Sequence, residues 1–520
     1  MDTWTSNFWA ENETECKRIL MEPGNWEKVP LFDHKTALGT LVRFKGMVQD
    51  MLNPEYYSKT FSVFNSVTNE TKIYQGKYHS FIVNKSEENI QLGDDLMERQ
   101  VVVCVPIPGL NKWVDDVTIS NNEIEVELQE NFNKRIRLDP ACQNPPKDVL
   151  IFVYPESVES CELKLNEIVE VVGFLNRRTI EEDNEDIESL PAKETYCIHT
   201  VHYKLFPNLT LNNIKTMDDC IWEEASSLHT ELKLILTQAL LGDSLVADYL
   251  LFHLVSTIYN RQRNHVPGKF SLNIRGIPNN IEKNYTTKLY SLISYLVVKS
   301  EYLSITIDSM NNTDMIPRKC YTSNRLLNGL LQLSNRTHLV LDETNLEPGK
   351  LDNKGMTNLQ ALTDVITNQQ MKYDFTYYTI DYETQIPVLT LSIGKSLLPC
   401  DIDIVLNPDP SCTNNIEETI DSAYNYLNSQ LLLLEKLRKY IAIISTFPFN
   451  FSEDVLQIIE NDYVEMRKAD VKNMSADDLH RFIMISKLIA LCAGKNELNK
   501  DIWESCKTLE SQRKLRNKSN

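Results

Sequence analysis

The sequence lacks the paired cysteines that mark most zinc and disulfide-rich proteins. Its eleven cysteines are scattered over 520 residues, and no two of them form a CxxC pair. Zinc sites and disulfide frameworks need closely spaced ligands or dense cysteine. His199 and His202 lie in a β-like run at a spacing that turns them to opposite sides of a strand. We therefore expect no metal site and no disulfides, with reduced thiols typical of an intracellular protein.

Basic residues are also in short supply. The chain has 53 Lys and Arg against 73 Asp and Glu, which gives a formal net charge of −20. Proteins that bind duplex DNA neutralise phosphates with clustered Lys and Arg, and an acidic surface repels that polyanion. Direct DNA binding is therefore not expected, and a protein partner with basic surfaces fits the charge better.

Long apolar runs are missing as well. Stretches such as LISYLVV (292–298) are far shorter than the roughly 20 residues that a membrane-spanning helix needs. The start, MDTWTSNFWAENETECKRIL, has no basic patch followed by an apolar core, so it does not resemble a signal peptide. These absences predict a soluble, internal protein with no stable membrane contact.

The first half of the chain is rich in predicted strands. A chain of 520 residues exceeds one hydrophobic core, so two to four domains are expected. Residues 38–200 contain short apolar or alternating runs separated by turn residues, which favours a small sandwich or barrel, with an OB-type barrel preferred. Gly173 predicts a bend within a barrel strand. The acidic segment 178–194 predicts a loop within this domain.

The second half has helical and then alternating periodicity. Apolar residues recur every three or four positions before residue 260, which predicts two amphipathic helices broken at Gly242-Asp243. Between residues 269 and 394, strands alternate with helices, one of them predicted over 324–333, and this order indicates a parallel sheet with crossovers. The rest is predicted helical, and the basic end (511–520) is predicted to be frayed.

The strand HLVLDE (338–343) ends in an acidic pair. In nucleotide-hydrolysing ATPases such a strand places one carboxylate near magnesium and the other near the attacking water. The alternative is an ordinary strand end, with Asp342 as a helix cap or a turn residue. The two interpretations differ in whether a phosphate-binding loop accompanies the pair.

The phosphate-binding loop, GxxxxGK[ST], should follow the first core strand. After FSLNIRG, Gly276 is in place, but Ile281, Glu282 and Lys283 stand where Gly, Lys and Ser or Thr are required. Ile281 would block the close approach of the backbone, and Glu282 would repel a phosphate. The Gly-Lys-Ser at 394–396 follows the acidic pair and lacks the first glycine. We conclude that the phosphate cradle is missing.

Several stretches together resemble the MCM (mini-chromosome maintenance) complex-binding protein family. They are FKGMVQDMLNPEYY, ALLGDSLVADYLLFHLVSTIYNR, GKFSLNIRGIP, YTSNRLLNGLLQL, LVLDETNLEPGKLDNKG, YDF, SIGKSLLP and NDYVEMRKADVKNMSADDLHRF. The similarity runs from about residue 25 to the end, and about 115–145 is the least recognisable part.

The resemblance implies a divergent relative of the MCM helicase subunits with a multidomain α+β fold. That fold has an N-terminal OB-like β-barrel, a central degenerate AAA+-like α/β domain with a parallel sheet, and a C-terminal helical lid. The predicted units are an extension (1–28), the OB-like domain (29–205), linking helices (206–260), the AAA+-like core (261–412), the lid (413–510) and a basic tail (511–520).

The same resemblance implies a nucleotide site without catalytic residues, metal or cofactor. Where a helicase subunit has its trans-acting arginine, this sequence has Cys400, and the sensor arginine is replaced by Asp477. Neither residue can stabilise a phosphoryl transition state as arginine does. The implied degenerate site comprises Gly276, Ile281, Glu282, Lys283, Asp342, Glu343, Cys400 and Asp477. Asp342 and Glu343 are thus interpreted as remnants of a metal-and-water motif.

The implied function is a non-catalytic protein that binds MCM helicase subunits. It would act as a pseudo-subunit or chaperone in assembly, disassembly and maintenance of the ring during DNA replication and, by family, in sister chromatid cohesion. A nuclear location with a cytoplasmic pool follows, as does chromatin association through MCM. The turn-rich segment after the acidic pair is predicted to be exposed, and it is either a partner surface or an ordinary connection. Its candidate residues are Glu343, Asn345, Pro348, Gly349, Lys350 and Asn353.

Two other functions stay open from the residues alone. One is an active ATPase with an unorthodox phosphate loop. The other is a single-strand nucleic-acid module that uses Arg43, Phe44 and Tyr56 of the OB-like domain, for which packing in the core and turns is the alternative. The basic tail at 511–520 is either a weak nuclear import signal or a solvated end.

Overall fold

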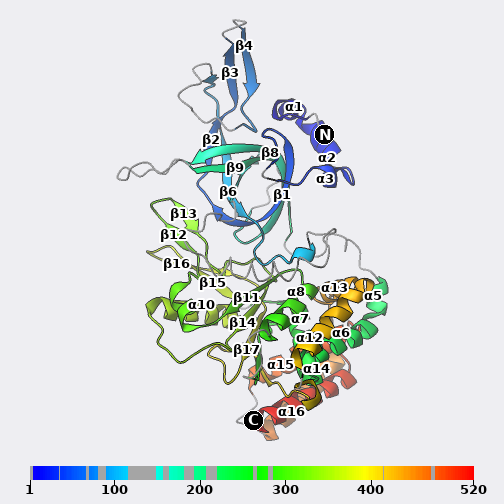
Figure 1. Ribbon diagram of the computed structural model, residues 1–520. Helices are drawn as coiled ribbons and strands as arrows, with labels where there is room; N and C mark the ends of the chain where they lie inside the picture. The colour runs from blue at the N-terminus through cyan, green and yellow to red at the C-terminus, as the bar shows by residue number, and fades with distance from the viewer. Residues whose placement is uncertain are drawn as a thin grey trace.

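The chain folds into two units that Figure 1 shows one above the other, a β-barrel and a helix-covered sheet. The computed structural model describes residues 4–33, 35–65, 70–79, 90–114, 148–155, 163–180, 193–206, 219–261, 266–278, 285–413, 415–469 and 475–519. The mixed architecture of helices and several sheets, one of them parallel, agrees with the predicted multidomain α+β class.

Five strands of the first unit close into a barrel. They are β1 (Leu41–Met51), β6 (Leu96–Val105), β7 (Val149–Val153), β8 (Ile168–Ile180) and β9 (Lys193–Leu205). Their order is β1-β8-β9-β7-β6, and β6 pairs with β1 to complete the ring. The pair β7–β9 is parallel and the other neighbours are antiparallel. Each run that predicted a strand in 38–200 therefore contains a barrel strand.

Both faces of the barrel strands are buried. One set of alternating side chains, which includes Val102 and Ile151, forms a cluster of its own. The opposite set, which includes Phe152, packs with Trp9 and Trp26 from the N-terminal helices. These helices are α1 (Ser6–Glu11), α2 (Glu13–Met21) and α3 (Asn25–Lys28).

The predicted bend at Gly173 is confirmed. The β8–β9 register shifts between Val172 and Gly173, and a Cβ on Gly173 would lie 2.3 Å from the backbone oxygen of His199. A strand that curves this tightly against its neighbour needs glycine. The predicted acidic loop is shorter than 178–194, since β8 continues to Ile180 and β9 begins at Lys193, and residues 181–192 lie outside the described residues.

A small sheet extends from the barrel at the top of Figure 1. It contains β3 (Thr60–Asn65), β4 (Glu70–Gln75) and β5 (Ile90–Leu92), all antiparallel, while β2 (Glu55–Ser58) adds to β6.

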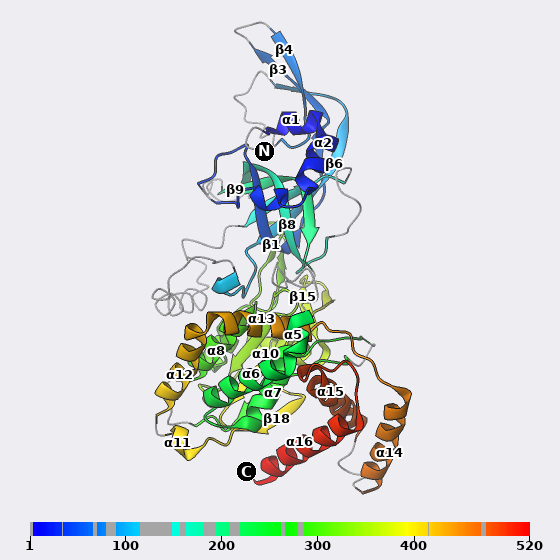
Figure 2. The same cartoon turned by 90° about the vertical axis from the view of Figure 1, so that its right-hand side faces the viewer.

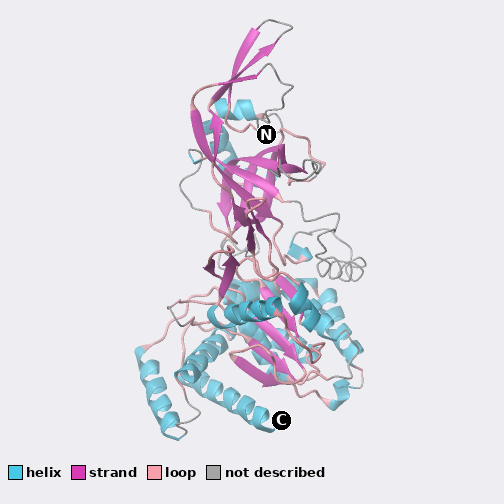
Figure 3. Cartoon of the chain, turned by 90° about the vertical axis from the view of Figure 1, so that its left-hand side faces the viewer, coloured by secondary structure: helices cyan, strands magenta, loops and turns pink. Residues whose placement is uncertain are grey.

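The second unit is built on a five-stranded sheet with parallel neighbours throughout, as predicted. Its spatial order is β11 (Ser300–Ser304), β14 (His338–Asp342), β17 (Val388–Ser392), β10 (Leu272–Arg275) and β18 (Ile402–Val405). Val340 and Leu389 face one core cluster, and Leu339 and Val388 face another. The first cluster involves α6 (Ala225–Ala239), α7 (Ser244–Val255) and α8 (Tyr285–Leu296), and the second involves α9 (Ile307–Asn312) and α10 (Asn353–Asn368). Figure 3 shows helices around this sheet.

The break between α6 and α7 falls where it was predicted. Asp243 caps α7, because its Oδ1 accepts from the backbone N–H groups of Leu245 and Val246. The prediction that α7 is amphipathic is wrong, since every residue from Leu245 to Val255 is buried. Within the described residues no single helix is long and apolar enough to cross a membrane. The α6–α7 pair passes that test by length and composition, with a bend of 118°.

A four-stranded sheet beside α10 was not predicted. Its order is β13 (Arg325–Leu327), β12 (Arg318–Cys320), β15 (Gln370–Asp374) and β16 (Thr379–Glu383). The helix predicted over 324–333 is wrong, because this segment contains β13. Asn324 has a φ of 49°, and a Cβ on Gly329 would lie 2.4 Å from the carbonyl carbon of Ile316, so the chain turns at both positions.

The other α-helices of the described residues are one that precedes α6 and six that follow β18. They are α5 (Asp219–Glu223), α11 (Pro410–Thr413), α12 (Ile416–Ser429), α13 (Leu431–Ile444), α14 (Glu453–Ala469), α15 (Ala476–Cys492) and α16 (Lys500–Ser519). Figure 2 shows α14, α15 and α16 below and to one side of the sheet.

The basic end is helical through Ser519 and three of its polar side chains contact the sheet unit, so the prediction of a frayed end is wrong. Arg513 Nη1 and Asn517 Nδ2 donate to the backbone oxygen of Asp403 at 2.9 and 2.8 Å. Arg516 Nη1 lies 2.6 Å from Oδ2 of Asp243, which is buried. Asp403 belongs to β18, an edge strand of the parallel sheet. The side chains of α16 therefore satisfy backbone groups that an edge strand leaves open.

Hydrogen bonds join the two units. Gln49 Nε2 donates to the backbone oxygen of Leu326 at 2.7 Å, and the Leu326 N–H donates to Asp50 Oδ2 at 2.8 Å. After β6 the chain, with the short helix η1 (Lys112–Val114), runs beside β11. There the Asn111 side chain donates to the backbone oxygen of Val297 at 2.7 Å.

Candidate functional site

Asp342 ends β14 at the carboxyl edge of the parallel sheet, where ligands bind in open α/β folds. Its side chain is fully buried. Oδ2 accepts hydrogen bonds from Thr286 Oγ1 at 2.7 Å and from the Tyr302 hydroxyl. Oδ1 accepts from the backbone N–H and the hydroxyl of Thr344 at 2.9 and 2.7 Å. A carboxylate has about four acceptor positions, so protein donors fill this one.

Glu343 is buried as well, with 6% of its surface exposed. Its Oε1 accepts from the Ser396 hydroxyl at 3.0 Å, and its Oε2 accepts from the Leu397 N–H at 3.1 Å. Burial raises the pKa of Glu343 above its ordinary value. The carboxylate thus connects the end of β14 to the loop that follows β17.

Gly276 follows β10, with a φ of +80° and an N–H that donates to the backbone oxygen of Ile393 at 3.0 Å. Ile281, Glu282 and Lys283 lie outside the described residues. Thr286, in the first turn of α8, donates to Asp342 from the described part of the segment that follows β10.

Sequence reasoning missed three donors to Asp342, namely Thr286, Tyr302 and Thr344. Thr344 had a signal, because a hydroxyl two positions after an Asp often bonds to that carboxylate. Thr286 and Tyr302 had none, because they lie 56 and 40 positions from Asp342.

Cys400 and Asp477 were predicted to belong to the same site. Cys400 lies before β18, and burial, helped by the carboxylates of Asp403 and Asp401, raises the pKa of its thiol to about 12. Asp477 is exposed in the first turn of α15, where Asp478 and Ser475 form the capping box. In the described part of the chain, no hydrogen bond joins Cys400 or Asp477 to Asp342. The structure therefore keeps Asp342 and Glu343 at the end of β14, with their carboxylates bonded to different elements, and within the described residues it shows no bond from the other two residues to Asp342.

The predicted partner loop is exposed in part. Asn345, Pro348, Gly349, Lys350 and Asn353 are exposed. Asn353 does not lie in the loop, however, because α10 begins there, capped by Asp352. Glu343 cannot serve as an exposed contact, because its carboxylate is held inside by the loop after β17.

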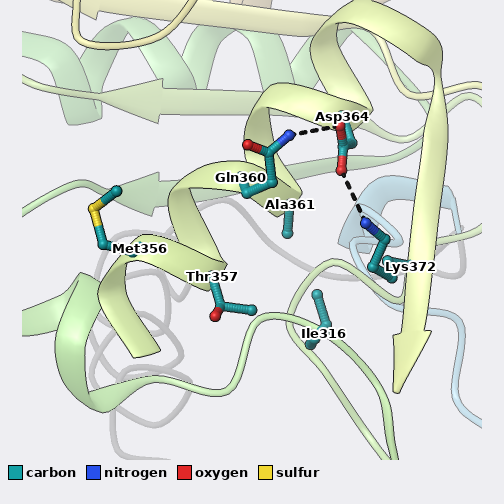
Figure 4. A pocket seen from close by; sticks show the side chains of 7 residues that line it. All are labelled: Ile316, Met356, Thr357, Gln360, Ala361, Asp364 and Lys372. Carbon is teal, nitrogen blue, oxygen red and sulfur yellow. Dashed lines mark hydrogen bonds and ion pairs between the residues drawn. The ribbon is translucent and has the colours of Figure 1, made fainter. Parts of the chain in front are cut away.

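A cavity of about 280 Å³ lies between α10 and β15 (Figure 4). Asp364 and Lys372 face one another there, 3.6 Å from Oδ2 to Nζ, and Gln360 donates to Asp364. Its lining residues are Ile316, Met356, Thr357, Gln360, Ala361, Asp364 and Lys372. Neither Asp342 nor Glu343 lines it, so it is separate from the acidic pair.

The candidate nucleic-acid residues of the barrel do not form an exposed groove. Phe44 is buried, and Arg43 Nη1 lies 3.4 Å from Glu170 Oε1 with 18% of the Arg43 side chain exposed. Tyr56 is 70% exposed. Among the described residues, no three His, Cys, Asp or Glu side chains converge as metal ligands would.

The fold and site describe a multidomain α/β protein whose acidic pair is enclosed by its own hydrogen-bond donors. The sequence model of the Mini-chromosome maintenance replisome factor family matches residues 16–144 and 125–517. The chain therefore belongs to this family, which confirms the resemblance.

Named relatives agree with this assignment. The chain is 32% identical to the Mini-chromosome maintenance complex-binding protein of Drosophila melanogaster, over 96% of this chain and 94% of that protein. It is 32% identical to the protein of that name from Gallus gallus, over 98% and 94%, and 30% identical to that from Homo sapiens, over 94% and 90%. The name given to these relatives is that of a binding protein.

Proposed function

We propose that this protein binds subunits of the MCM helicase and does not hydrolyse ATP. The name of its relatives, which states MCM complex binding, supports the partner. The single observation that carries the non-catalytic part is the hydrogen bonding of Asp342. A magnesium ligand needs an oxygen available to the ion or to its water shell. Thr286, Tyr302 and Thr344 use that capacity in Asp342.

We assign the barrel as OB-like and the parallel sheet as AAA+-like. The closed five-strand ring with one parallel pair, β7–β9, supports the first assignment. In the sheet, β10 comes first in the chain and lies between β17 and β18. The segments that follow β10, β14 and β17 consequently meet at one edge, as a nucleotide site built on such a sheet requires.

The proposed mechanism is that of a pseudo-subunit. An AAA+-shaped unit docks head to tail on a helicase subunit, as a neighbouring ring subunit would. Because it cannot form the second interface, with the next subunit along, it keeps the ring from closing. This action would serve assembly, maintenance and disassembly of the ring in DNA replication, and sister chromatid cohesion through it. We propose a nuclear location with a cytoplasmic pool, and chromatin association through the helicase.

The test mixes the purified protein with helicase subunits and measures the mass of the complexes and their ATP turnover. We expect partial rings that contain this protein and no turnover by the protein alone. A closed ring that includes it would overturn the pseudo-subunit mechanism. Tight magnesium-dependent ATP binding by the isolated protein, with turnover, would overturn the non-catalytic assignment.

A further inference from the structure

The outer strand of the four-stranded sheet has an open backbone edge. Among the described strands, β16 pairs with β15 alone. The Phe375 N–H donates to the Tyr378 oxygen at 3.0 Å, and the Thr384 N–H donates to the Gln369 oxygen at 2.9 Å. These two bonds show that the backbone groups of Tyr378 and Thr384 face β15. Backbone groups alternate in direction along an antiparallel strand. Those of Thr379, Asp381 and Glu383 therefore point away from β15. Such an edge is a template for an added strand.

The side chains around this edge are exposed to an unusual degree. All residues of β16 except Tyr382 are exposed. At the β15–β16 turn, Tyr377 is 84% and Tyr378 is 56% exposed. Tyr321, from the β12–β13 turn, is 52% exposed, and its ring centroid lies 5.6 Å from that of Tyr377. Tyrosines are enriched among the residues that contribute most to binding in protein interfaces.

The sheet holds the tyrosine cluster, which is Tyr321, Tyr377 and Tyr378, in position. The Tyr321 hydroxyl donates to the backbone oxygen of Phe375 at 2.9 Å, and the Phe375 and Tyr378 rings stack with centroids 5.1 Å apart. A pre-positioned aromatic cluster loses little conformational entropy when it binds a partner.

The charges on β16 indicate the kind of segment that would bind. Its carboxylates are Asp381 and Glu383, and Glu383 Oε2 lies 3.7 Å from Arg261 Nε. Lys372, opposite Asp381 in the register, pairs with Asp364 of α10. Asp381 thus has no ion pair of its own within the described ranges, and it lies in the middle of the open edge. A basic side chain on an added strand would face it favourably.

We propose that β16 docks an extended, basic segment of a helicase subunit. The segment adds a strand beside β16, places a Lys or Arg near Asp381, and packs apolar side chains on Tyr321, Tyr377 and Tyr378. This inference rests on the proposed function, because the partner is the one named there.

The test compares three variants of the full-length protein in titrations against purified helicase subunits. Tyr377→Ser should weaken binding by about tenfold, because it removes an exposed aromatic contact. Asp381→Asn removes the charge and keeps the backbone N–H, so we expect a loss of about threefold at low salt that shrinks at high salt. Asp381→Pro also removes the outward N–H without touching a bond to β15, and it should weaken binding further than Asp381→Asn.

Tyr56→Ser is the control, since Tyr56 is another largely exposed tyrosine, 70% against 84% for Tyr377, on β2 beside the barrel, and it should bind as the unchanged protein does. Circular dichroism verifies that each variant is folded, and the Asn and Ser variants decide the question if the Pro variant unfolds. If all three β16 variants bind with unchanged affinity, the proposed docking at the β16 edge is wrong, while the proposed function still stands. A complete lack of binding by the unchanged protein would overturn the proposed function itself.

Discussion

Replacing Asp342 with alanine tests whether this carboxylate is structural or is a metal ligand. The change leaves four hydrogen-bond donors, from Thr286, Tyr302 and Thr344, without their acceptor in a fully buried position. Each buried donor left unsatisfied costs roughly 1–3 kcal/mol, but hydroxyl groups can turn to other acceptors. We therefore expect the free energy of unfolding of the sheet unit to fall by about 3–5 kcal/mol. One kcal/mol shifts the melting temperature of a unit of this size by about 2–4 °C, so the melting temperature should fall by roughly 10 °C.

The assay records thermal unfolding by calorimetry and magnesium-ATP binding on the same samples. Asp314→Ala is the control, because the Asp314 side chain is 78% exposed and has one ion pair, to Lys354 at 2.7 Å. It should stay within about 0.5 kcal/mol of the unchanged protein. In a functional metal site, removal of a carboxylate tends to maintain or raise stability while it abolishes activity. That pair of results for Asp342→Ala would refute the structural role.

Three further changes test the packing of the fold. Burial lowers the pKa of Lys299 from 10.5 to about 7, so between these values the unfolded chain holds a proton that the folded chain lacks. The free energy of unfolding should then rise with pH by up to about 1.4 kcal/mol per pH unit. Urea titrations at several pH values should record a smaller rise for Lys299→Met. An equal rise in the two proteins would contradict this. Arg516→Ala removes the ion-pair partner of buried Asp243, so the free energy of unfolding should fall by about 3 kcal/mol. The control Lys518→Ala, at an exposed position, should change it very little in the same thermal unfolding experiment. Equal effects of the two changes would argue against the ion pair. Gly173→Ala places a Cβ 2.3 Å from a backbone oxygen and should lower the melting temperature of the barrel, whereas a neutral result would mean that the strand can relax.

The sequence predicted those strands whose burial leaves a continuous apolar or alternating run. The strands β10, β14 and β17 of the parallel sheet are buried along their length apart from Arg275, and all three were found. The strand β16 was missed because four of its five residues are exposed, so its pattern carries no hydrophobic period. Leucines at 326, 327, 330 and 331 recur at the three and four spacing of a helix, although a strand and turns bring Leu326, Leu331 and Leu333 into one core cluster. Hydrophobic periodicity reports which residues are buried. It does not predict the secondary structure correctly where turns, and not a regular helix or strand, bring the residues into the core.

The candidate site was predictable in its position and not in its contacts. The acidic pair could be placed at a strand end from six residues, but Thr286 and Tyr302 reach Asp342 from other elements of the fold. The basic end illustrates the same limit. Its charges predicted solvent exposure, yet Arg516 pairs with Asp243, 273 positions away. Tertiary packing determines which residues pair at such distances along the chain. The local sequence pattern does not carry that information.

The pairing of α16 with β18 has a consequence for how the protein is made. Lys500, where α16 begins, comes about 95 positions after Val405, where β18 ends. A ribosome adds about 5–20 residues per second, so the nascent sheet waits about 5–20 seconds before synthesis of the helix that covers its edge even begins. During that interval β18 can associate with strands of other nascent chains. The edge of the sheet is therefore covered late, after the other four strands have been made, and translation speed between β18 and α16 should influence the yield of folded protein.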